Sequence, residues 1–260
     1  MSPLDPKRTV QELKDLRALT GNEDGAWRVA WTDTWLEARR FMREKTDALG
    51  LETHMDAAGN VWSTLKGESD VELLIGGHID SVPGGGWLDG SLNVLAGLEV
   101  IRTIRQQGIR TRHPIVLVNW TNEEGARFAP SLMGSGVFAG TLSQDAVDDS
   151  RDLDGLRFGD EIARIGWRGE TPARAFPIHA LFEYHIEQGP ILEAEGLPIG
   201  IVTHGQGARW VEVEVTGSAA HAGSTPMDMR RDAMLGAARI TEAVNRIALD
   251  NPDAVGTVGH

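Results

Sequence analysis

Apolar residues along the chain fall into short continuous runs and longer stripes at helical spacing. Three runs are bounded by glycine or polar residues and predict buried strands: VELLIGG (71–77), PIVLVNW (114–120) and ALFEYHI (180–186). Three stripes predict helices: residues 9–19, 33–48 and 90–107. Strands that alternate with helices indicate an α/β fold, in which we expect a mixed, mostly parallel sheet with helices on both faces.

Three further segments complete this first part of the chain. Residues 51–66 alternate in polarity around Gly59-Asn60, a turn signal, and predict a β-hairpin. Residues 131–140 are glycine-rich and predict a short helix, whereas residues 144–177 are polar, charged and weakly patterned. We expect residues 144–177 to form a helix and loop excursion on the surface.

The pattern changes near residue 205. LPIGIVTH (197–204) predicts a fourth strand, and ARWVEVEVTG (208–217) alternates as a half-exposed strand does. A long amphipathic helix is expected from about Pro226 to Ala248. We therefore divide the chain into two domains: residues 1–205 and residues 206–260.

Composition and net charge limit the kinds of molecule that the protein is expected to bind. The chain has 260 residues, of which 41% are hydrophobic and 24% charged, as in a soluble globular protein. Its formal net charge of -13 would repel a nucleic acid. No apolar run approaches the length of a membrane span, and the polar N-terminal segment lacks the apolar core of a signal peptide. We therefore expect a cytoplasmic protein with neither a nucleic acid nor a membrane as partner.

The chain contains no cysteine. This excludes disulfides, thiolate metal ligands and a cysteine nucleophile. Any metal site must therefore use histidine, aspartate and glutamate side chains.

Such side chains follow each of the first three predicted strands, in GGHIDSVPGGGWLDG (76–90), NEEGARF (122–128) and YHIEQGP (184–190). Open α/β sheets bind ligands at the carboxyl ends of their strands. We therefore expect one crevice to contain His78, Asp80, Asp89, Glu123, Glu124, His185 and Glu187.

These residue types suit divalent ions such as zinc, manganese, cobalt or nickel. In an extended segment Asp80 lies on the same face as His78 and could orient its ring. Glu123 and Glu124 cannot both point the same way, so one could bind metal while the other faces substrate. Each motif by itself is weak, because paired glutamates are usually solvated and a lone histidine is usually structural. The coincidence of three clusters at three strand ends favours a shared metal site.

The chain closely resembles the amidase branch of the M20 metallopeptidase clan. The resemblance lies in these clusters, the third extended to HIEQGPILE (185–193), and in three further segments: LAGLEV (95–100), MGSGVFAG (133–140) and GSAAHAGSTPMDMRRDA (217–233). That branch contains N-carbamoyl-L-amino-acid hydrolases, allantoate amidohydrolases, ureidoglycolate amidohydrolases and β-ureidopropionases. The resemblance runs from about residue 25 to the chain end. It implies a zinc-exopeptidase-like catalytic domain and an α+β lid or dimerisation domain, of which this chain holds only part.

The resemblance implies a role for each candidate residue. His78, Asp89 and His185 would hold one metal ion, and Asp89 would bridge to a second ion that Glu124 also binds. Glu123 would be the general base that takes a proton from the bridging water. Asp80 would orient His78.

Two more roles concern substrate. Gln188 would contact it in the pocket. His221, in the lid, would stabilise the tetrahedral intermediate and would reach the site across a homodimer; the alternative is a histidine that merely ends a lid strand. The implied reaction is hydrolysis of the carbamoyl C–N bond of a small N-carbamoyl amino acid or an allantoate-like substrate, which yields ammonia, carbon dioxide and an amine.

Two alternatives remain open. The first is a dipeptidase or deacylase of the same clan, which His185 disfavours because many of those relatives have an acidic ligand there. The second is a non-catalytic truncated fragment that binds one metal and dimerises. In the family a last histidine ligand and a lid arginine and asparagine come later in the chain, and His260 is not expected to replace that ligand. Asn93 also departs from the small residue that is common in the family.

Overall fold

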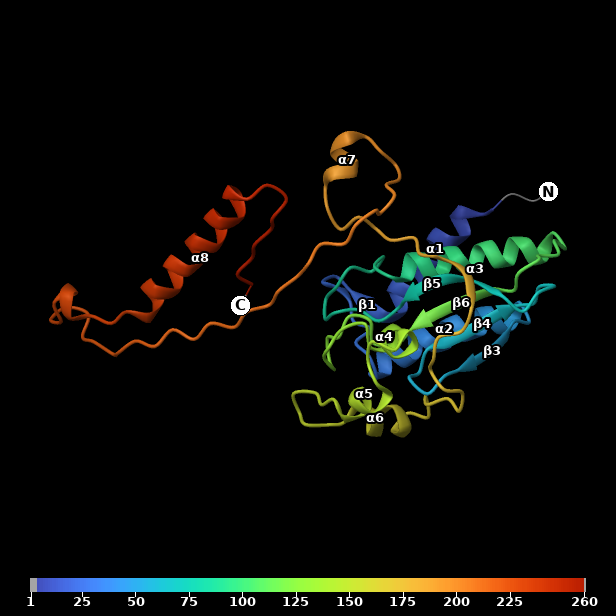
Figure 1. The fold of residues 1–260 in the computed structure, drawn as a ribbon, viewed down its shortest axis with the longest axis horizontal. Helices are drawn as coiled ribbons and strands as arrows, with labels where there is room; N and C mark the ends of the chain where they lie inside the picture. The colour runs from blue at the N-terminus through green and yellow to red at the C-terminus, as the bar shows by residue number, and fades with distance from the viewer. Residues whose placement is uncertain (1–3, 260) are drawn as a thin grey trace. The chain divides into compact units, whose positions relative to one another are not determined.

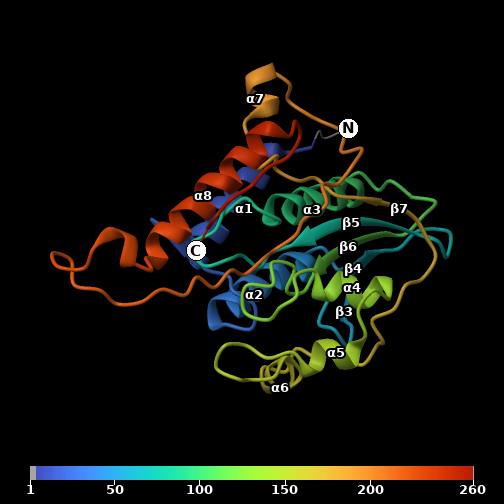
Figure 2. The same cartoon turned by 60° about the vertical axis from the view of Figure 1, so that its left-hand side comes forward.

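A computed structural model describes residues 4–259. The chain divides into two compact units, the first ending at Leu197 and the second beginning at Pro198. Each unit is described by itself. Figures 1 and 2 show the sheet of the first unit from two sides.

The first unit is built on a five-stranded sheet in the order β3-β4-β6-β5-β7. Its strands are β3 (Glu52–Met55), β4 (Val61–Leu65), β5 (Glu72–His78), β6 (Ile115–Trp120) and β7 (Ile178–Phe182). β5 pairs in parallel with both β6 and β7, whereas β4 pairs antiparallel with both β3 and β6. The predicted hairpin and the three predicted strands of this region are confirmed, in a mixed α/β sheet.

β6 is central, and every one of its residues is buried. Ile115 and Leu117 face a core formed with α1 (Pro6–Thr20), α2 (Asp33–Ala48) and α3 (Ser91–Gln106). Val116, Val118 and Trp120 face the other side, where Phe138 of α4 (Met133–Ala139) packs. A strand covered on both faces reads as a continuous apolar run, which is why it was recognisable in the sequence. Helices therefore cover both faces of the sheet, as predicted.

Asn93, the departure from the family pattern, is accommodated inside the first unit. Its side chain is buried on α3 and donates a hydrogen bond to the carbonyl oxygen of Gly76 in β5. This bond ties the helix to the strand that leads into the candidate site.

Residues 144–177 contain α5 (Gln144–Asp149) and α6 (Phe158–Arg164), so the helices and loops expected here are present. Most of the segment lies at the surface, but apolar residues anchor it. Val147, Phe158 and Ile162 are buried in a second core with Trp31 and Trp35. The Trp31 ring meets Trp35 and Phe158 edge to face, with ring centroids 4.5 and 5.1 Å apart. Isolated apolar residues in a polar segment give no periodic signal, so this core was not predicted.

The second unit contains a 3-10 turn, η1 (Met227–Met229), and a long helix, α8 (Ala233–Asp250), which match the helix expected from Pro226 to Ala248. The strands predicted over residues 197–204 and 208–217 are wrong, because neither segment forms a strand. Alternating polarity indicates which face of a strand would be buried, but a strand also needs a neighbour for its N–H and C=O groups. Within residues 4–259 no neighbour pairs with these segments, and Trp210 is 96% exposed.

The structure adds two short strands that the sequence pattern did not indicate, β1 (Gly21–Asn22) and β2 (Gly25–Ala26), and one short helix, α7 (Ile191–Glu195). Among the described residues, no helix combines the length and apolar composition needed to cross a membrane.

A buried ion cluster joins α1 to α3. Glu99 accepts hydrogen bonds from Arg8 Nε at 2.8 Å, Arg8 Nη2 at 2.7 Å, Arg102 Nη1 at 2.6 Å and the Asp5 N–H at 3.0 Å. Burial by itself raises the pKa of Glu99, but these bonds outweigh it and lower the pKa from 4.5 to about 2. The carboxylate is thus favoured in the folded state.

We predict that Glu99→Gln lowers the free energy of unfolding at neutral pH by about 3 kcal/mol. Because the folded pKa is depressed, the stabilisation is fully present above pH 4.5 and is lost as the pH falls toward 2. Urea unfolding of both proteins across this range measures the difference, which should shrink with falling pH. The exposed pair Arg40–Glu37 offers a matched control, since Glu37→Gln should cost less than about 1 kcal/mol.

Candidate metal centre

Strand pairing brings the three candidate clusters to one edge of the sheet. In the parallel pair β5–β6, His78 lies opposite Trp120, and these are the last residues of the two strands. Asp80 follows two residues after β5, Glu123 three residues after β6, and His185 three residues after β7. The carboxyl ends of parallel strands thus meet here, as the sequence analysis expected.

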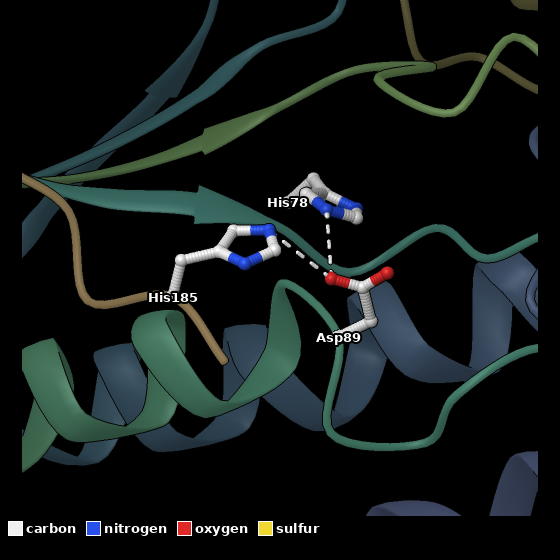
Figure 3. A group of neighbouring side chains, drawn as sticks. All are labelled: His78, Asp89 and His185. Carbon is white, nitrogen blue, oxygen red and sulfur yellow. Dashed lines mark ion pairs between the residues drawn. The ribbon is translucent and has the colours of Figure 1, made fainter. Parts of the chain in front are cut away.

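His78, Asp89 and His185 form the tightest group. One possible ligand atom from each lies within 4.8 Å of those of the other two. His185 Nε2 lies 3.2 Å from Asp89 Oδ1, and His78 Nε2 lies 4.0 Å from the same oxygen. Figure 3 shows a nitrogen of each ring directed at this oxygen, from two segments of the chain that are far apart in sequence. His78 and Asp89 are buried, whereas His185 is 39% exposed and gives the group an open side.

The remaining ring nitrogens are held by the backbone. His78 Nδ1 lies 3.0 Å from the carbonyl oxygen of Asp80, and His185 Nδ1 lies 2.7 Å from that of Ile186. A carbonyl oxygen only accepts, so each Nδ1 carries the proton and donates it. In the neutral ring each Nε2 is then an unprotonated nitrogen with a lone pair, which is the form that binds a metal.

Asp80 holds the site together in a different way from the one expected. Its carbonyl oxygen, rather than its carboxylate, accepts from the His78 ring, while Oδ1 lies 3.7 Å from His78 Nδ1. Oδ2 accepts the backbone N–H of Glu124 at 3.1 Å. Asp80 therefore orients His78 through its backbone and links the loop after β5 to the loop after β6 through its side chain.

Asp89 approaches His78 because the next residue is glycine. Gly90 has φ 61°, and a Cβ there would lie 2.5 Å from the His78 ring. Asp89 Oδ2 accepts a hydrogen bond from Gln188 Nε2 at 2.7 Å. Asp89 Oδ1 is buried and has no hydrogen-bond partner.

Glu123 and Glu124 lie beyond a sharp turn, where Asn122 has φ 47° and donates its side-chain amide to the Phe128 carbonyl at 2.8 Å. Glu123 Oε2 is 3.5 Å from His78 Nε2. Burial is the main cause that raises the pKa of both glutamates; neighbouring carboxylates raise it further, and His78 opposes this. For His78 burial lowers the pKa, but the surrounding carboxylates outweigh it and raise the pKa.

Two buried arginines behind the site gave no signal in the sequence. Arg28 Nε donates to the Ile79 carbonyl at 2.6 Å, just after β5. Arg39 donates to the carbonyls of Asn119 and Trp120 at 3.2 and 2.9 Å, at the end of β6. Burial lowers the pKa of Arg28 to about 10 and of Arg39 to about 9, against the opposing attraction of Asp80. Both remain cations at neutral pH and partly offset the acidic side chains.

Not every expected residue joins the group. The Glu187 carboxylate accepts the N–H groups of Ile191 and Leu192 at 3.0 and 3.1 Å and caps α7, so the expectation that it enters the crevice is wrong. Its side chain can reach those free N–H groups at the start of the helix, which attract a carboxylate. Glu124 lies outside the three-residue group. His221 belongs to the second unit, and His260 lies outside the described residues.

The residues present fit a divalent cation. An unpartnered, buried carboxylate oxygen is faced by two imidazole nitrogens that carry lone pairs. Buried polar atoms normally have partners, so the unpaired Asp89 Oδ1 calls for one. Nitrogen and oxygen ligands without sulfur suit zinc, manganese, cobalt or nickel and do not distinguish among them.

Comparison with known proteins agrees with this chemistry. Residues 74–258 match the sequence model of peptidase family M20/M25/M40. The chain is 50% identical over 243 residues to an N-carbamoyl-L-amino-acid amidohydrolase of Rhizobium meliloti, which covers 92% of this chain and 58% of that protein. It is 35% identical over 244 residues to a ureidoglycolate hydrolase of Oryza sativa subsp. japonica, covering 89% and 50%.

Solved structures show the same likeness. A hydantoinase/carbamoylase family amidase from Burkholderia ambifaria superposes with a TM-score of 0.85 at 41% identity, over 99% of this chain and 64% of that one. The chain thus spans less than two thirds of the length of each of these relatives. The prediction of the amidase branch of the M20 clan is confirmed.

We predict that a divalent ion stabilises the chain through Asp89. At a free zinc concentration 100 times its dissociation constant, the free energy of unfolding should rise by about 2.7 kcal/mol. Asp89→Asn should remove most of this rise, because the carboxylate charge that faces both histidines is lost. Thermal unfolding with and without zinc or manganese measures the effect.

Glu187→Gln is the matched control for this measurement, because it makes the same change of acid to amide in the cap of α7. It should retain the full metal-induced shift. Equal shifts in the wild type and in Asp89→Asn would rule out the three-residue group as the metal centre.

Proposed function

Because the chain belongs to peptidase family M20/M25/M40, we propose that it carries the metal-binding part of a hydrolase that cleaves the carbamoyl C–N bond of a small ureido acid. One observation carries the proposal: His78 and His185 present their Nε2 atoms to the unpartnered oxygen of Asp89. The names of the similar proteins, an N-carbamoyl-L-amino-acid amidohydrolase and a ureidoglycolate hydrolase, supply the substrate class.

In this proposal His78, Asp89 and His185 hold one ion, and Asp89 and Glu124 hold a second. A bound divalent ion makes water more acidic and polarises a carbonyl oxygen. Zinc, manganese, cobalt and nickel all remain candidates for the ion.

Glu123 is the proposed general base. Its carboxylate is partly buried beside the group, 3.5 Å from His78 Nε2, so it can reach a water molecule held there. Its raised pKa brings it closer to the pH at which a base can both accept and return a proton. Asp80 keeps the two loops in register by binding the N–H of Glu124.

The proposed reaction uses one water molecule. The water oxygen bonds to the carbamoyl carbon, and Glu123 takes the water proton. The C–N bond to the substrate amine then breaks, and the leaving nitrogen receives that proton. The products are the amine and carbamic acid, which separates into ammonia and carbon dioxide.

Other parts of the proposal concern substrate and assembly. Gln188, which donates to Asp89 Oδ2 at 2.7 Å, lies beside the group and would contact substrate. Residues 1–205 would form the catalytic domain and residues 206–260 the beginning of a lid, where His221 would stabilise the tetrahedral intermediate. Homodimerisation through the lid and a cytoplasmic location also stay predictions.

A second candidate function is binding of a single ion without turnover. The observation that favours it is that the described residues form one group of three possible ligands, His78, Asp89 and His185, which suffices for one ion. Metal titration of the chain distinguishes the two, since the hydrolase proposal expects two ions per chain and the alternative expects one.

We predict that the metal-loaded chain releases ammonia from N-carbamoyl amino acids or related ureido acids. Glu123→Gln should lower kcat by about 100-fold to 10,000-fold, because the proton acceptor is lost. Metal binding, measured by calorimetry, should be unchanged in this variant. Glu187→Gln should keep wild-type activity.

The outcome against the proposal is also specific. If N-acyl amino acids or dipeptides were cleaved while every ureido acid stayed intact, the chain would be a deacylase or dipeptidase of the same family. If none were cleaved and one ion bound per chain, the single-ion alternative would stand.

A further inference from the structure

The turn around His221 holds its imidazole ring by backbone amides. His221 Nδ1 accepts the N–H of Gly223 at 3.1 Å and the N–H of Ser224 at 3.1 Å. Both donors belong to the same short turn, two and three residues further along the chain. The ring is therefore fixed at one nitrogen, and the residue as a whole is exposed.

These two bonds decide which nitrogen carries the proton. Backbone N–H groups only donate, so the nitrogen that receives them must offer a lone pair. Nδ1 is thus unprotonated, and the neutral ring has its hydrogen on Nε2. His221 consequently presents an Nε2–H donor away from the turn, rather than a lone pair.

Arg230 closes the same turn from the other side. Its Nη2 donates to the carbonyls of Ala222 at 2.7 Å, Thr225 at 3.0 Å and His221 at 3.5 Å, and its Nε donates to Thr225 at 3.1 Å. The planar guanidinium thus binds three carbonyls of one turn at once, which a flexible ammonium does less well. Arg230 thus binds the carbonyl groups of the turn, while the N–H groups of Gly223 and Ser224 bind the His221 ring.

Arg230 is itself anchored next to a rigid element. η1 ends at Met229, and α8 begins at Ala233 with Asp232 Oδ1 accepting the N–H of Leu235 at 3.0 Å. The neighbouring Arg231 contributes only its backbone, whose carbonyl accepts the N–H of Ser218 at 2.9 Å, and its side chain is exposed. The two adjacent arginines therefore differ in role although they have the same charge.

We propose that Arg230 is a positioning residue that, with the N–H groups of Gly223 and Ser224, holds His221 as the Nε2–H tautomer for hydrogen bonding to a developing oxyanion. The oxyanion as the target of the His221 Nε2–H donor rests on the proposed function. The placement of the proton on Nε2 rests on the hydrogen bonds of the turn alone. A donor that is oriented before the reaction needs no reorganisation when negative charge appears.

The test is nitrogen-15 NMR of histidine-labelled full chain, at a pH where the ring is neutral. The His221 signals are assigned by their loss in His221→Gln. We expect Nδ1 to resonate as an unprotonated nitrogen and Nε2 as a protonated one. A His221 ring with its proton on Nδ1, or an even mixture of tautomers, would overturn the inference.

Arg230→Gln should shift the His221 signals toward a tautomer mixture, whereas Arg231→Gln, the matched control, should leave them unchanged. If hydrolysis is present, Arg230→Gln should lower kcat by about 100-fold with little change in KM, as expected when a catalytic group is displaced. Arg230→Lys should recover part of this loss. Unchanged His221 signals in Arg230→Gln would remove Arg230 from the role.

Two further comparisons keep the outcomes separate. If the circular dichroism of Arg230→Gln showed a loss of helix, Arg230→Lys would be compared with the wild type by NMR in place of Arg230→Gln. If the wild-type ring is the Nε2–H tautomer but no ureido acid is cleaved, the proposed function fails and the positioning by Arg230 stands. If cleavage occurs but the tautomer is the other one, only the positioning inference fails.

Discussion

The parallel register of β5 with β6 is the constraint on which the candidate metal centre depends. His78 lies opposite Trp120, so the two strands end together and the loops that follow them share one edge. A slip by one residue would turn every side chain of β5 to the other face of the sheet, and His78 with it. The two buried faces of β6, one carrying Leu117 and the other carrying Val118, fix this register by packing into separate cores.

Charge imposes the second requirement on this edge of the sheet. Asp80, Asp89, Glu123 and Glu124 meet there, and burial together with the neighbouring carboxylates raises the pKa of Glu123 and of Glu124. Arg28 and Arg39 supply positive charge from behind, but their hydrogen bonds go to strand-end carbonyls rather than to these carboxylates. The arginines therefore fix the backbone that carries the acids, while Asp89 Oδ1 is left without a hydrogen bond. A divalent cation bound at this edge would reduce the repulsion among the carboxylates and would give Asp89 Oδ1 a partner.

The sequence predicted the parts of this arrangement that leave a periodic or clustered signal. Continuous apolar runs identified β5 and β6, and polar clusters at their ends identified His78 and Asp89. Arg28 and Arg39 could not be found, because arginine is usually exposed and nothing in the sequence marks a buried one. Residues 208–217 were predicted as a strand because alternation specifies a face, but it does not supply a pairing partner. Glu187 was misplaced for a related reason, since its motif gave its position after β7 but not the helix start that captures its carboxylate.

Histidine rings in the two units carry their proton on different nitrogens, and the hydrogen-bonded backbone group decides which one. At His78 and His185 the nearest backbone group is a carbonyl, so Nδ1 donates and Nε2 keeps a lone pair. At His221 the nearest backbone groups are amides, so Nδ1 accepts and Nε2 carries the proton. The first form can bind a cation but cannot donate from Nε2, and the second can donate to an anion but cannot bind a cation there without losing its proton. In each unit the form is set by local chain geometry before any ligand arrives.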